Sequence, residues 1–428
     1  MPSQSQLNDY FEYLRIPSIS ADPAYRNSML ECCIWLNSKF SGLGFQSQIL
    51  ETAGAPVVLA KSGFSPKKKT VLIYGHYDVQ PVDPEHLWTH PPFEPVIENG
   101  FVVARGATDN KGQTFCHILG TEALLKSGRE LPVNVVYLLE GQEEIGSPHL
   151  GAFLREHRHE LACDIVLVSD TSMVGPAYPA ITCGLRGISC LEIKVTGPTA
   201  DMHSGMYGGT IANPARELSR LLARLHNDDG SVAIPGFYDH VLPLSGVDRE
   251  TWRDIPFGEN EILAATGSPK LSGENGYSAL ERIWVRPTAE INGITAGYQG
   301  PGSKTIVPTY ASAKLSFRLV PHQKPEQIAA QAREYLTSIC PDTVRLEITY
   351  DHGGEPYYLD PENPYVRIAR EALTEVFGRQ PWASLTATRT PRTRPSPWPT
   401  STTASTCIKS SSRNWRINLP SQTLQLSS

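Results

Sequence analysis

The stretch Val71-Leu72-Ile73-Tyr74-Gly75-His76-Tyr77-Asp78 passes from a short apolar run directly into an imidazole and a carboxylate. The four apolar residues predict a buried β-strand, and the glycine that follows them allows the backbone to turn tightly. Functional sites in open α/β sheets lie beyond the carboxyl ends of the strands. His76 and Asp78 are therefore candidates for such a site.

The same pattern occurs twice more along the chain. Val133–Leu139 is a second apolar run and leads into Glu143 and Glu144, whereas Asp164–Val168 is a third and leads into Asp170. The segments between these runs show helical spacing of apolar residues, most clearly from Lys111 to Ser127 and, after a Ser-Pro start, from Ser147 to His157. Continuous apolar strands that alternate with helices predict an α/β domain whose central sheet is covered on both faces.

A second unit is predicted from about Gly184 to Glu355. Strands are expected at 188–195, 311–320 and 344–350, and helices at 214–226 and 325–339. This mixture of strands and two helices predicts a small α+β domain inserted into the first one. The segment Pro364–Phe377 reads as a helix that returns to the first domain.

The last part of the chain has a different composition. From Ser384 onward it contains 19 Ser or Thr and six Arg or Lys, but no Asp, Glu, Gly or Val. Such a segment buries little apolar area, so it is expected to be disordered or poorly packed.

Composition excludes several classes of function. The formal net charge of −6 gives no reason to expect nucleic acid or an anionic membrane as a partner. No run approaches 18 apolar residues, and the first residues lack a basic and then apolar signal segment. The eight cysteines have no CxxC spacing and are expected to be reduced. A cytoplasmic protein is therefore expected.

The polar residues at the predicted strand ends can bind a divalent metal ion. Imidazole nitrogen and carboxylate oxygen are suitable ligands, which makes His76, Asp109, Glu144 and Asp170 candidates. Asp109 can bridge two ions that activate a water and polarise a carbonyl. Asp78 can accept the N–H of the His76 ring nitrogen that does not bind metal. One residue of the adjacent Glu pair can bind metal while the other acts as general base. Spacing alone does not decide which of Glu143 and Glu144 is the ligand and which is the base.

Two features of the inserted domain are ambiguous from the residues alone. Asp201-Met202-His203-Ser204-Gly205 precedes two further glycines, and by itself it favours an ordinary exposed loop. Arg318 lies on an apolar strand, where an arginine is usually exposed but can also pair with a substrate carboxylate.

These motifs together resemble the M20 family of metallopeptidases, and in particular its cytosolic nonspecific dipeptidase or carnosinase-like branch. The resemblance covers about residues 1–382. It is carried by Gly75–Pro81, Arg105–Gly112, Glu140–Ser147, Val168–Thr171, Asp201–Gly209, Ser303–Pro308 and Phe317–Pro321.

The resemblance implies a catalytic domain that is split around an inserted lid and dimerisation domain. The implied limits are 1–183 and 356–382 for the catalytic domain, 184–355 for the lid, and 383–428 for the atypical tail. Metal ligands would be His76, Asp109, Glu144 and Asp170, with Asp109 bridging two ions; zinc is expected, although manganese or cobalt also suits such ligands.

The resemblance also implies roles for the other candidates. Glu143 would be the general base and Asp78 the partner of His76. His203 would reach into the site of the partner subunit in a homodimer to bind the peptide substrate, with Thr305 and Arg318 also contacting it. A cis peptide bond is implied between Asp109 and Asn110.

The chain departs from the family pattern after Phe377. The family has a glycine-rich substrate loop there and a final histidine ligand, whereas no histidine follows His352 in this chain. A reading-frame shift or a divergent tail would each explain the change.

The expected function is metal-dependent hydrolysis of the peptide bond of a dipeptide or short peptide. The alternatives are an N-acyl amino acid deacylase of the same architecture and a catalytically impaired chain that still dimerises.

Overall fold

The structure is a computed structural model of the 428-residue chain. It describes residues 2–98, 100–171, 179–244, 252–253, 255, 257–387, 408–411 and 414–417, the segments from 382 onward by their backbone alone. The chain forms two compact units. The first contains the chain up to Ala180, Pro364–Pro381 and the described residues 408–411 and 414–417, and the second contains Ile181–Asn363 and residues 382–387. The fold is mixed α/β, and the first unit is assembled from three separate stretches of chain. The role of the second unit as a lid remains a prediction.

The first unit is built on a five-stranded sheet with the order β1-β2-β6-β3-β7. Its strands are β1 Gln46–Leu50, β2 Val57–Lys61, β3 Thr70–His76, β6 Asn134–Glu140 and β7 Ile165–Val168. Strand β3 pairs in parallel with both β6 and β7, whereas β2 pairs antiparallel with β1 and β6. The three apolar runs of the sequence are therefore neighbouring parallel strands whose carboxyl ends share one edge.

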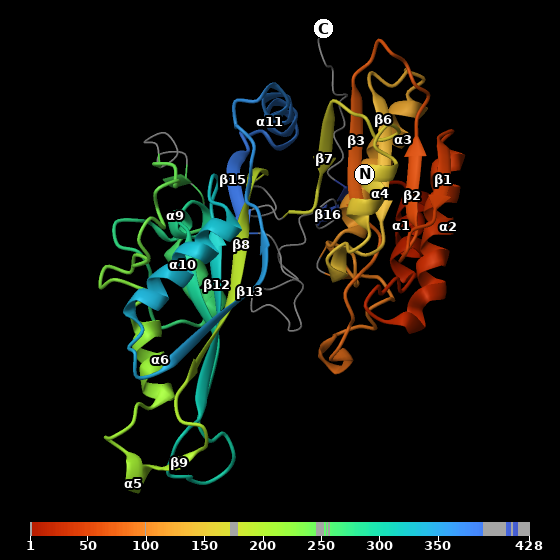
Figure 1. Cartoon of the computed structure of the whole chain (residues 1–428). Helices are drawn as coiled ribbons and strands as arrows, with labels where there is room; N and C mark the ends of the chain where they lie inside the picture. The colour runs from red at the N-terminus through yellow and green to blue at the C-terminus, as the bar shows by residue number, and fades with distance from the viewer. Residues whose placement is uncertain are drawn as a thin grey trace. The chain divides into compact units, whose positions relative to one another are not determined.

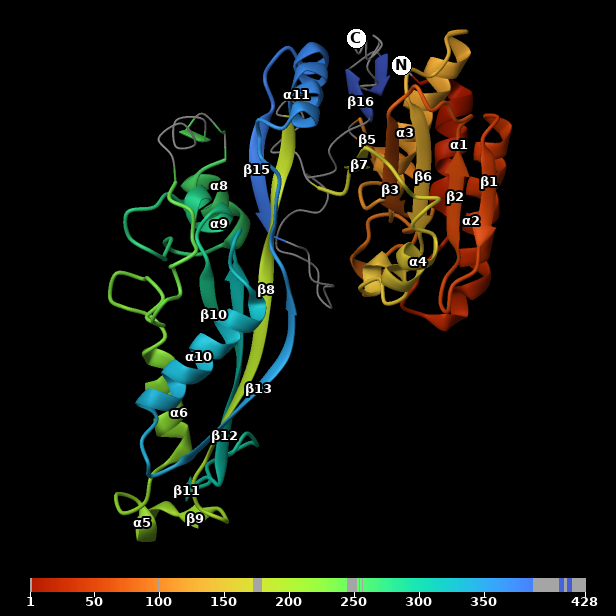
Figure 2. The ribbon, with the colours of Figure 1, turned by 45° about the horizontal axis from the view of Figure 1, so that its top comes forward.

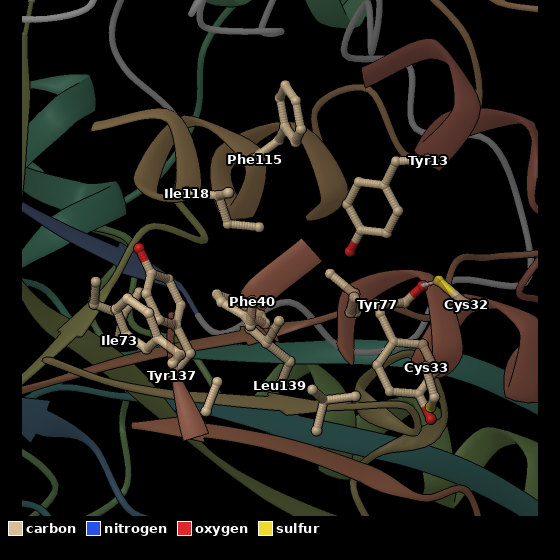
Figure 3. Close-up of a cluster of buried hydrophobic side chains, with 14 of the residues drawn as sticks. Tyr13, Cys32, Cys33, Phe40, Ile73, Tyr77, Phe115, Ile118, Tyr137 and Leu139 are labelled. Atoms are coloured by element: carbon tan, nitrogen blue, oxygen red, sulfur yellow. Dashed lines mark hydrogen bonds between the residues drawn. The ribbon is translucent and has the colours of Figure 1, made fainter. Parts of the chain in front are cut away.

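Helices cover both faces of this sheet (Figure 1). They are α1 Gln4–Arg15, α2 Arg26–Gly42, α3 Lys111–Lys126 and α4 Leu150–Glu156. The main core lies between α1, α2, α3 and one face of the sheet, where Tyr13, Phe40, Phe115 and Tyr137 are all buried (Figure 3). A smaller core places Phe153 of α4 against the other face.

Strand β7 departs from the expectation of a sheet that is covered throughout. It is an edge strand, and Val166, Leu167 and Val168 are 52%, 37% and 47% exposed. The apolar run was correctly predicted as a strand, but its edge position leaves its side chains without the cover that β3 and β6 have.

Three shorter helical turns and a hairpin complete the first unit. They are η1 Pro23–Tyr25, η2 Glu85–Leu87 and η3 Glu143–Ile145, and the hairpin of β4 Val96–Glu98 with β5 Phe101–Val103. Helix α11 Pro364–Phe377 also belongs to this unit and has the predicted bounds.

The second unit is an antiparallel sheet with the core order β10-β12-β8-β13. The strands are β8 Ala180–Thr196, β10 Thr288–Ala296, β12 Tyr310–Leu319, β13 Arg345–Gly354, β14 Tyr357–Tyr358 and β15 Trp382–Ala387, the last two pairing with β8. Figure 2 shows β8 running the length of this sheet.

Two helices supply the core of the second unit. Helices α6 Pro214–Ala223 and α10 Pro325–Ile339 pack their apolar side chains against β8, β10 and β12 (Figure 2). Leu218, Leu221 and Leu222 of α6 are buried, as their helical spacing predicts. The remaining elements are β9 Met202–His203, α5 Ser204–Tyr207, α8 Glu259–Thr266, α9 Ala279–Trp284 and β11 Ile306–Val307.

Two local predictions were wrong. Helix α4 begins at Leu150, not at Ser147, because Ser147 has a φ of 49° and its hydroxyl donates to Glu140 instead of capping a helix. Cys116 on α3 is disulfide-bonded, so the expectation of reduced cysteines fails at this residue.

The tail contains two described strands, β16 Ile408–Ser411 and β17 Asn414–Ile417, which form a hairpin. Most of the segment from Ser384 lies outside the described residues, so the expectation of poor packing stays a prediction. None of the helices in the described part of the chain is long and apolar enough to cross a membrane.

Gly75 is required by close packing at the end of β3. A Cβ at this position would lie 2.6 Å from Thr114 Oγ1 and 2.7 Å from Asn110 Oδ1. We expect Gly75→Ala to destabilise the first unit by about 1–3 kcal/mol, the usual cost of overpacking.

Urea unfolding measures this effect, and Gly120→Ala is the matched control. Gly120 lies inside α3, and a Cβ added there would meet no atom within 4 Å, so alanine should stabilise the protein by about 1 kcal/mol. Equal stability of Gly75→Ala and the unchanged protein would contradict the packing argument.

Candidate metal centre

His76 is the last residue of β3, and its side chain is fully buried. Its Nδ1 lies 3.0 Å from the main-chain oxygen of Asp78 and 3.3 Å from Oδ1 of the same residue. Both atoms are acceptors, so in the neutral imidazole the proton belongs on Nδ1. The lone pair is then on Nε2, the nitrogen that points away from Asp78.

Nε2 of His76 faces a group of carboxylates from other strand ends. It lies 3.3 Å from Asp109 Oδ1, 3.6 Å from Asp170 Oδ2 and 3.9 Å from Glu143 Oε2. Although buried, Nε2 forms no hydrogen bond with any residue that the structure describes. A buried nitrogen lone pair among carboxylates fits the donor set of a divalent cation.

The potential ligand atoms form two overlapping groups. His76, Asp109 and Glu144 make up one, and His76, Glu143 and Asp170 the other; within each, one ligand atom per residue lies within 4.8 Å of the others. The structure thus brings all five predicted metal and base residues together. Within the described residues, one imidazole is shared between the two groups.

Asn110 connects three of these residues. Its Nδ2 donates to Asp170 Oδ1 at 3.1 Å and to Ser169 O at 3.0 Å. Its Oδ1 accepts from Thr114 at 2.9 Å and from the main-chain N–H of His76 at 3.4 Å. The Asp109–Asn110 peptide bond is cis, as predicted. Asn110 therefore holds the ends of β3 and β7 in a common geometry.

The Glu143–Ile145 turn is held from two sides. Asp78 accepts the backbone N–H groups of Glu143 at 3.2 Å and Glu144 at 3.1 Å. Gln80 donates to the Glu144 carboxylate at 2.8 Å. Gly146 ends the turn in the left-handed region with a φ of 87°, which glycine adopts without a steric penalty.

Burial and charge repulsion shift the pKa values of this cluster. Burial, together with neighbouring carboxylates, raises the pKa of Glu143 to about 7 and that of Glu144 to about 8. Burial alone would lower the pKa of His76, but the attraction of the protonated ring to the carboxylates of Asp109, Asp170 and Asp78 outweighs it and raises that pKa well above the usual value. Without a cation, protons are the species that neutralise the site.

Arg105 is a positively charged side chain that acts electrostatically on this cluster. It stacks on Trp88 at 5.0 Å and donates to Pro81 O at 2.8 Å, and burial lowers its pKa. Its charge acts on Glu144 and Asp109, so it offsets part of their repulsion.

The predicted substrate-binding residues lie in the second unit. His203 and Thr305 are exposed neighbours, because β9 pairs with β11 and Ser204 N–H donates to Thr305 O at 3.0 Å. Arg318 is half-buried near the opposite end of β12, where it pairs with Ile188 and Thr288. A ten-residue strand spans about 30 Å. Within one chain, Arg318 is therefore far from the other two.

Sequence reasoning missed Asn110 and Gln80. Asn110 lies within the motif Arg105–Gly112, and Gln80 lies two residues after Asp78. Both are common surface residue types, so neither stood out in the sequence. Only the approach of three separate loops shows that their amide groups orient Asp170 and Glu144.

The pKa shifts predict that metal affinity depends on pH. Metal binding requires deprotonated ligand carboxylates and a neutral imidazole, so protons must leave Glu144 and His76. Affinity should therefore fall as pH is lowered from about 8 to 6, by about tenfold per pH unit for each proton displaced.

Calorimetry in buffers of different ionisation enthalpy measures both the affinity and the number of protons released. Glu144→Gln is the control variant, since it removes the group with a pKa of about 8 and should flatten the profile in that range. An affinity that stays constant between pH 6 and 8.5 would contradict the assignment.

Comparisons with known proteins identify the family of this chain. Residues 72–392 match the family Peptidase family M20/M25/M40. The chain is 32% identical to the Cys-Gly metallodipeptidase DUG1 of Saccharomyces cerevisiae over 86% of this chain and 81% of that protein. A metallo-carboxypeptidase of the M20 family from Sulfolobus solfataricus has a similar structure, with 33% identity, a TM-score of 0.74 and coverage of 91% of this chain and 87% of that one.

Human carnosine dipeptidase 1 is also similar in structure. It has 28% sequence identity and a TM-score of 0.70, over 89% of this chain and 84% of that one. Because the family match covers most of the chain and includes the strand ends that carry the carboxylates, this chain belongs to peptidase family M20/M25/M40.

Proposed function

We propose that this chain hydrolyses the peptide bond of dipeptides or short peptides with the help of divalent metal ions. The observation that carries the proposal is the buried Nε2 of His76, which faces Asp109, Asp170 and Glu143 at 3.3–3.9 Å. Two similar proteins, a Cys-Gly metallodipeptidase and a carnosine dipeptidase, support dipeptides as the substrate class.

The described residues offer a ligand set for two ions. His76, Asp109 and Asp170 would hold one, and Asp109 with Glu144 would hold the other, so that Asp109 bridges them. When bound, such ions polarise a substrate carbonyl and lower the pKa of a water molecule. Zinc is the metal that we propose, with manganese and cobalt as alternatives that the same donor atoms accept.

Glu143 is the residue that we propose as general base. Burial raises its pKa to about 7, which suits a group that takes up and releases a proton near neutral pH. Its backbone is held by Asp78, while its carboxylate stays beside His76. Glu144, in contrast, has a carboxylate oriented by Gln80, as suits a ligand. Glu143 would move the proton from water to the leaving amine.

The second unit would supply substrate contacts and the dimer interface. His203 and Thr305 lie together at one end of the unit. Arg318 lies near the other end of β12, a strand that is about 30 Å long. This separation supports the proposal that His203 and Thr305 serve the site of a partner subunit. The edge strand β10, with Ile291 and Ile294 exposed, supports a homodimer through this unit. A cytoplasmic location also stays a prediction.

A dipeptide assay with zinc or manganese tests the proposed function. We expect faster hydrolysis of dipeptides with free amino groups than of N-acyl amino acids, and a low absolute rate. The low rate is expected because no histidine follows His352, so the second ion would have an incomplete set of ligands.

The matched comparison is the same chain with a histidine-containing family tail restored. Hydrolysis of N-acyl amino acids alone would contradict the dipeptidase proposal. Two tightly held ions and full turnover in the present chain would show that another residue replaces the missing histidine.

Glu143→Gln tests the general base. The amide cannot accept the proton, so turnover should fall by about 10²–10⁴-fold while metal content stays unchanged. Metal analysis and kcat are measured on the same preparation. Glu156→Gln, an exposed change on α4, is the control and should keep its activity. Near-normal turnover of Glu143→Gln would refute the assigned role.

A further inference from the structure

Asp78 has more partners than its pairing with His76 requires. Its carboxylate is fully buried, and Oδ1 lies 3.3 Å from His76 Nδ1 and accepts the N–H of Glu143 at 3.2 Å. Oδ2 accepts the N–H of Glu144 at 3.1 Å and the hydroxyl of Ser20 at 2.6 Å. The last of these partners, Ser20, lies in a segment to which no role in the site has been assigned.

Ser20 belongs to the connection between α1 and α2, which lies against the loop after β3. Ile19 and Val79 form a parallel β-bridge, and Val79 N–H donates to Ser18 O at 2.9 Å. The hydroxyl of Ser18 donates to Tyr77 O at 2.6 Å. The backbone of this segment is therefore fixed next to Asp78, independently of the Ser20 side chain.

The same segment is tied to the loop that carries Asp109. The ammonium group of Lys111 is completely buried and donates to Tyr13 O at 3.0 Å and Ile16 O at 2.7 Å. The end of α1 thus contacts the first residue of α3, and the residues that follow α1 contact the loop after β3. Because the backbone of this segment is fixed, the Ser20 hydroxyl can hold the Asp78 carboxylate in a defined position.

The bond from Ser20 is short and its acceptor is a carboxylate, which makes it one of the stronger kinds of hydrogen bond. It restrains rotation of the Asp78 carboxylate, whose two oxygens must each meet one backbone N–H of the Glu143–Glu144 pair. If the carboxylate rotates, at least one of these N–H groups loses its acceptor, and the turn that carries both glutamates shifts.

We propose that Ser20 is a positioning residue of the metal centre, which acts through Asp78 on the Glu143–Glu144 turn. Any effect of Ser20 on catalysis depends on the proposed metallopeptidase function. Its consequence for metal binding can be measured without any substrate.

The deciding experiment compares Ser20→Thr with Ser20→Val. The two side chains have nearly the same shape, but only threonine keeps the hydroxyl. Metal affinity is measured by competition with a chelator, using zinc alone as the probe, together with urea unfolding of the metal-free protein. We expect Ser20→Val to bind zinc about tenfold more weakly than Ser20→Thr, within the range that is usual for loss of a group that orients a ligand.

Ser18→Ala is the matched control. It also removes a serine hydroxyl from the same segment, but that hydroxyl donates to the main-chain oxygen of Tyr77 and not to Asp78. We expect it to lower stability and leave zinc affinity within about twofold of the unchanged protein.

Equal zinc affinity of Ser20→Val and Ser20→Thr would overturn the proposal, and so would an equal loss in Ser18→Ala. If Ser20→Val binds zinc more weakly but the unchanged protein cleaves no dipeptide, the positioning role stands and the proposed function fails.

Discussion

The crowding of carboxylates around one buried imidazole is the constraint on which the site depends. Asp109, Glu143 and Asp170 approach His76 Nε2 within 3.9 Å at an edge of the sheet that is partly shielded from water. Burial raises the pKa values of Glu143 and Glu144, and repulsion between like charges in this space adds to the shift. A divalent cation would relieve this repulsion, and the imidazole and carboxylate donors suit such an ion.

Neighbouring groups keep this repulsive cluster in place. Asp78 accepts two backbone N–H groups of the glutamate turn, Asn110 donates to Asp170, and Gln80 donates to Glu144. Each of these bonds joins loops that follow different strands. The parallel pairing of β3 with β6 and β7 brings those loops to one edge, and the close packing at Gly75 lets Asn110 reach across it.

The second unit divides its candidate residues between the two ends of β12. His203 and Thr305 are joined through the β9–β11 ladder, whereas Arg318 lies near the opposite end of the sheet. A dipeptide is much shorter than the roughly 30 Å of strand between them. One copy of the unit therefore cannot place all three residues on one substrate, which is the physical reason why the dimer proposal assigns them to two sites.

By itself, the sequence determined the strands β3, β6 and β7, the helices α3, α6, α10 and α11, and the polar residues at the strand ends. These features follow from apolar periodicity, which is local. Tertiary structure decided the rest. The start of α4 moved because the backbone at Ser147 is left-handed, and the exposure of β7 depends on its edge position in the sheet. The contacts of Ser20, Gln80 and Asn110 join residues far apart in the chain, so no local pattern encodes them.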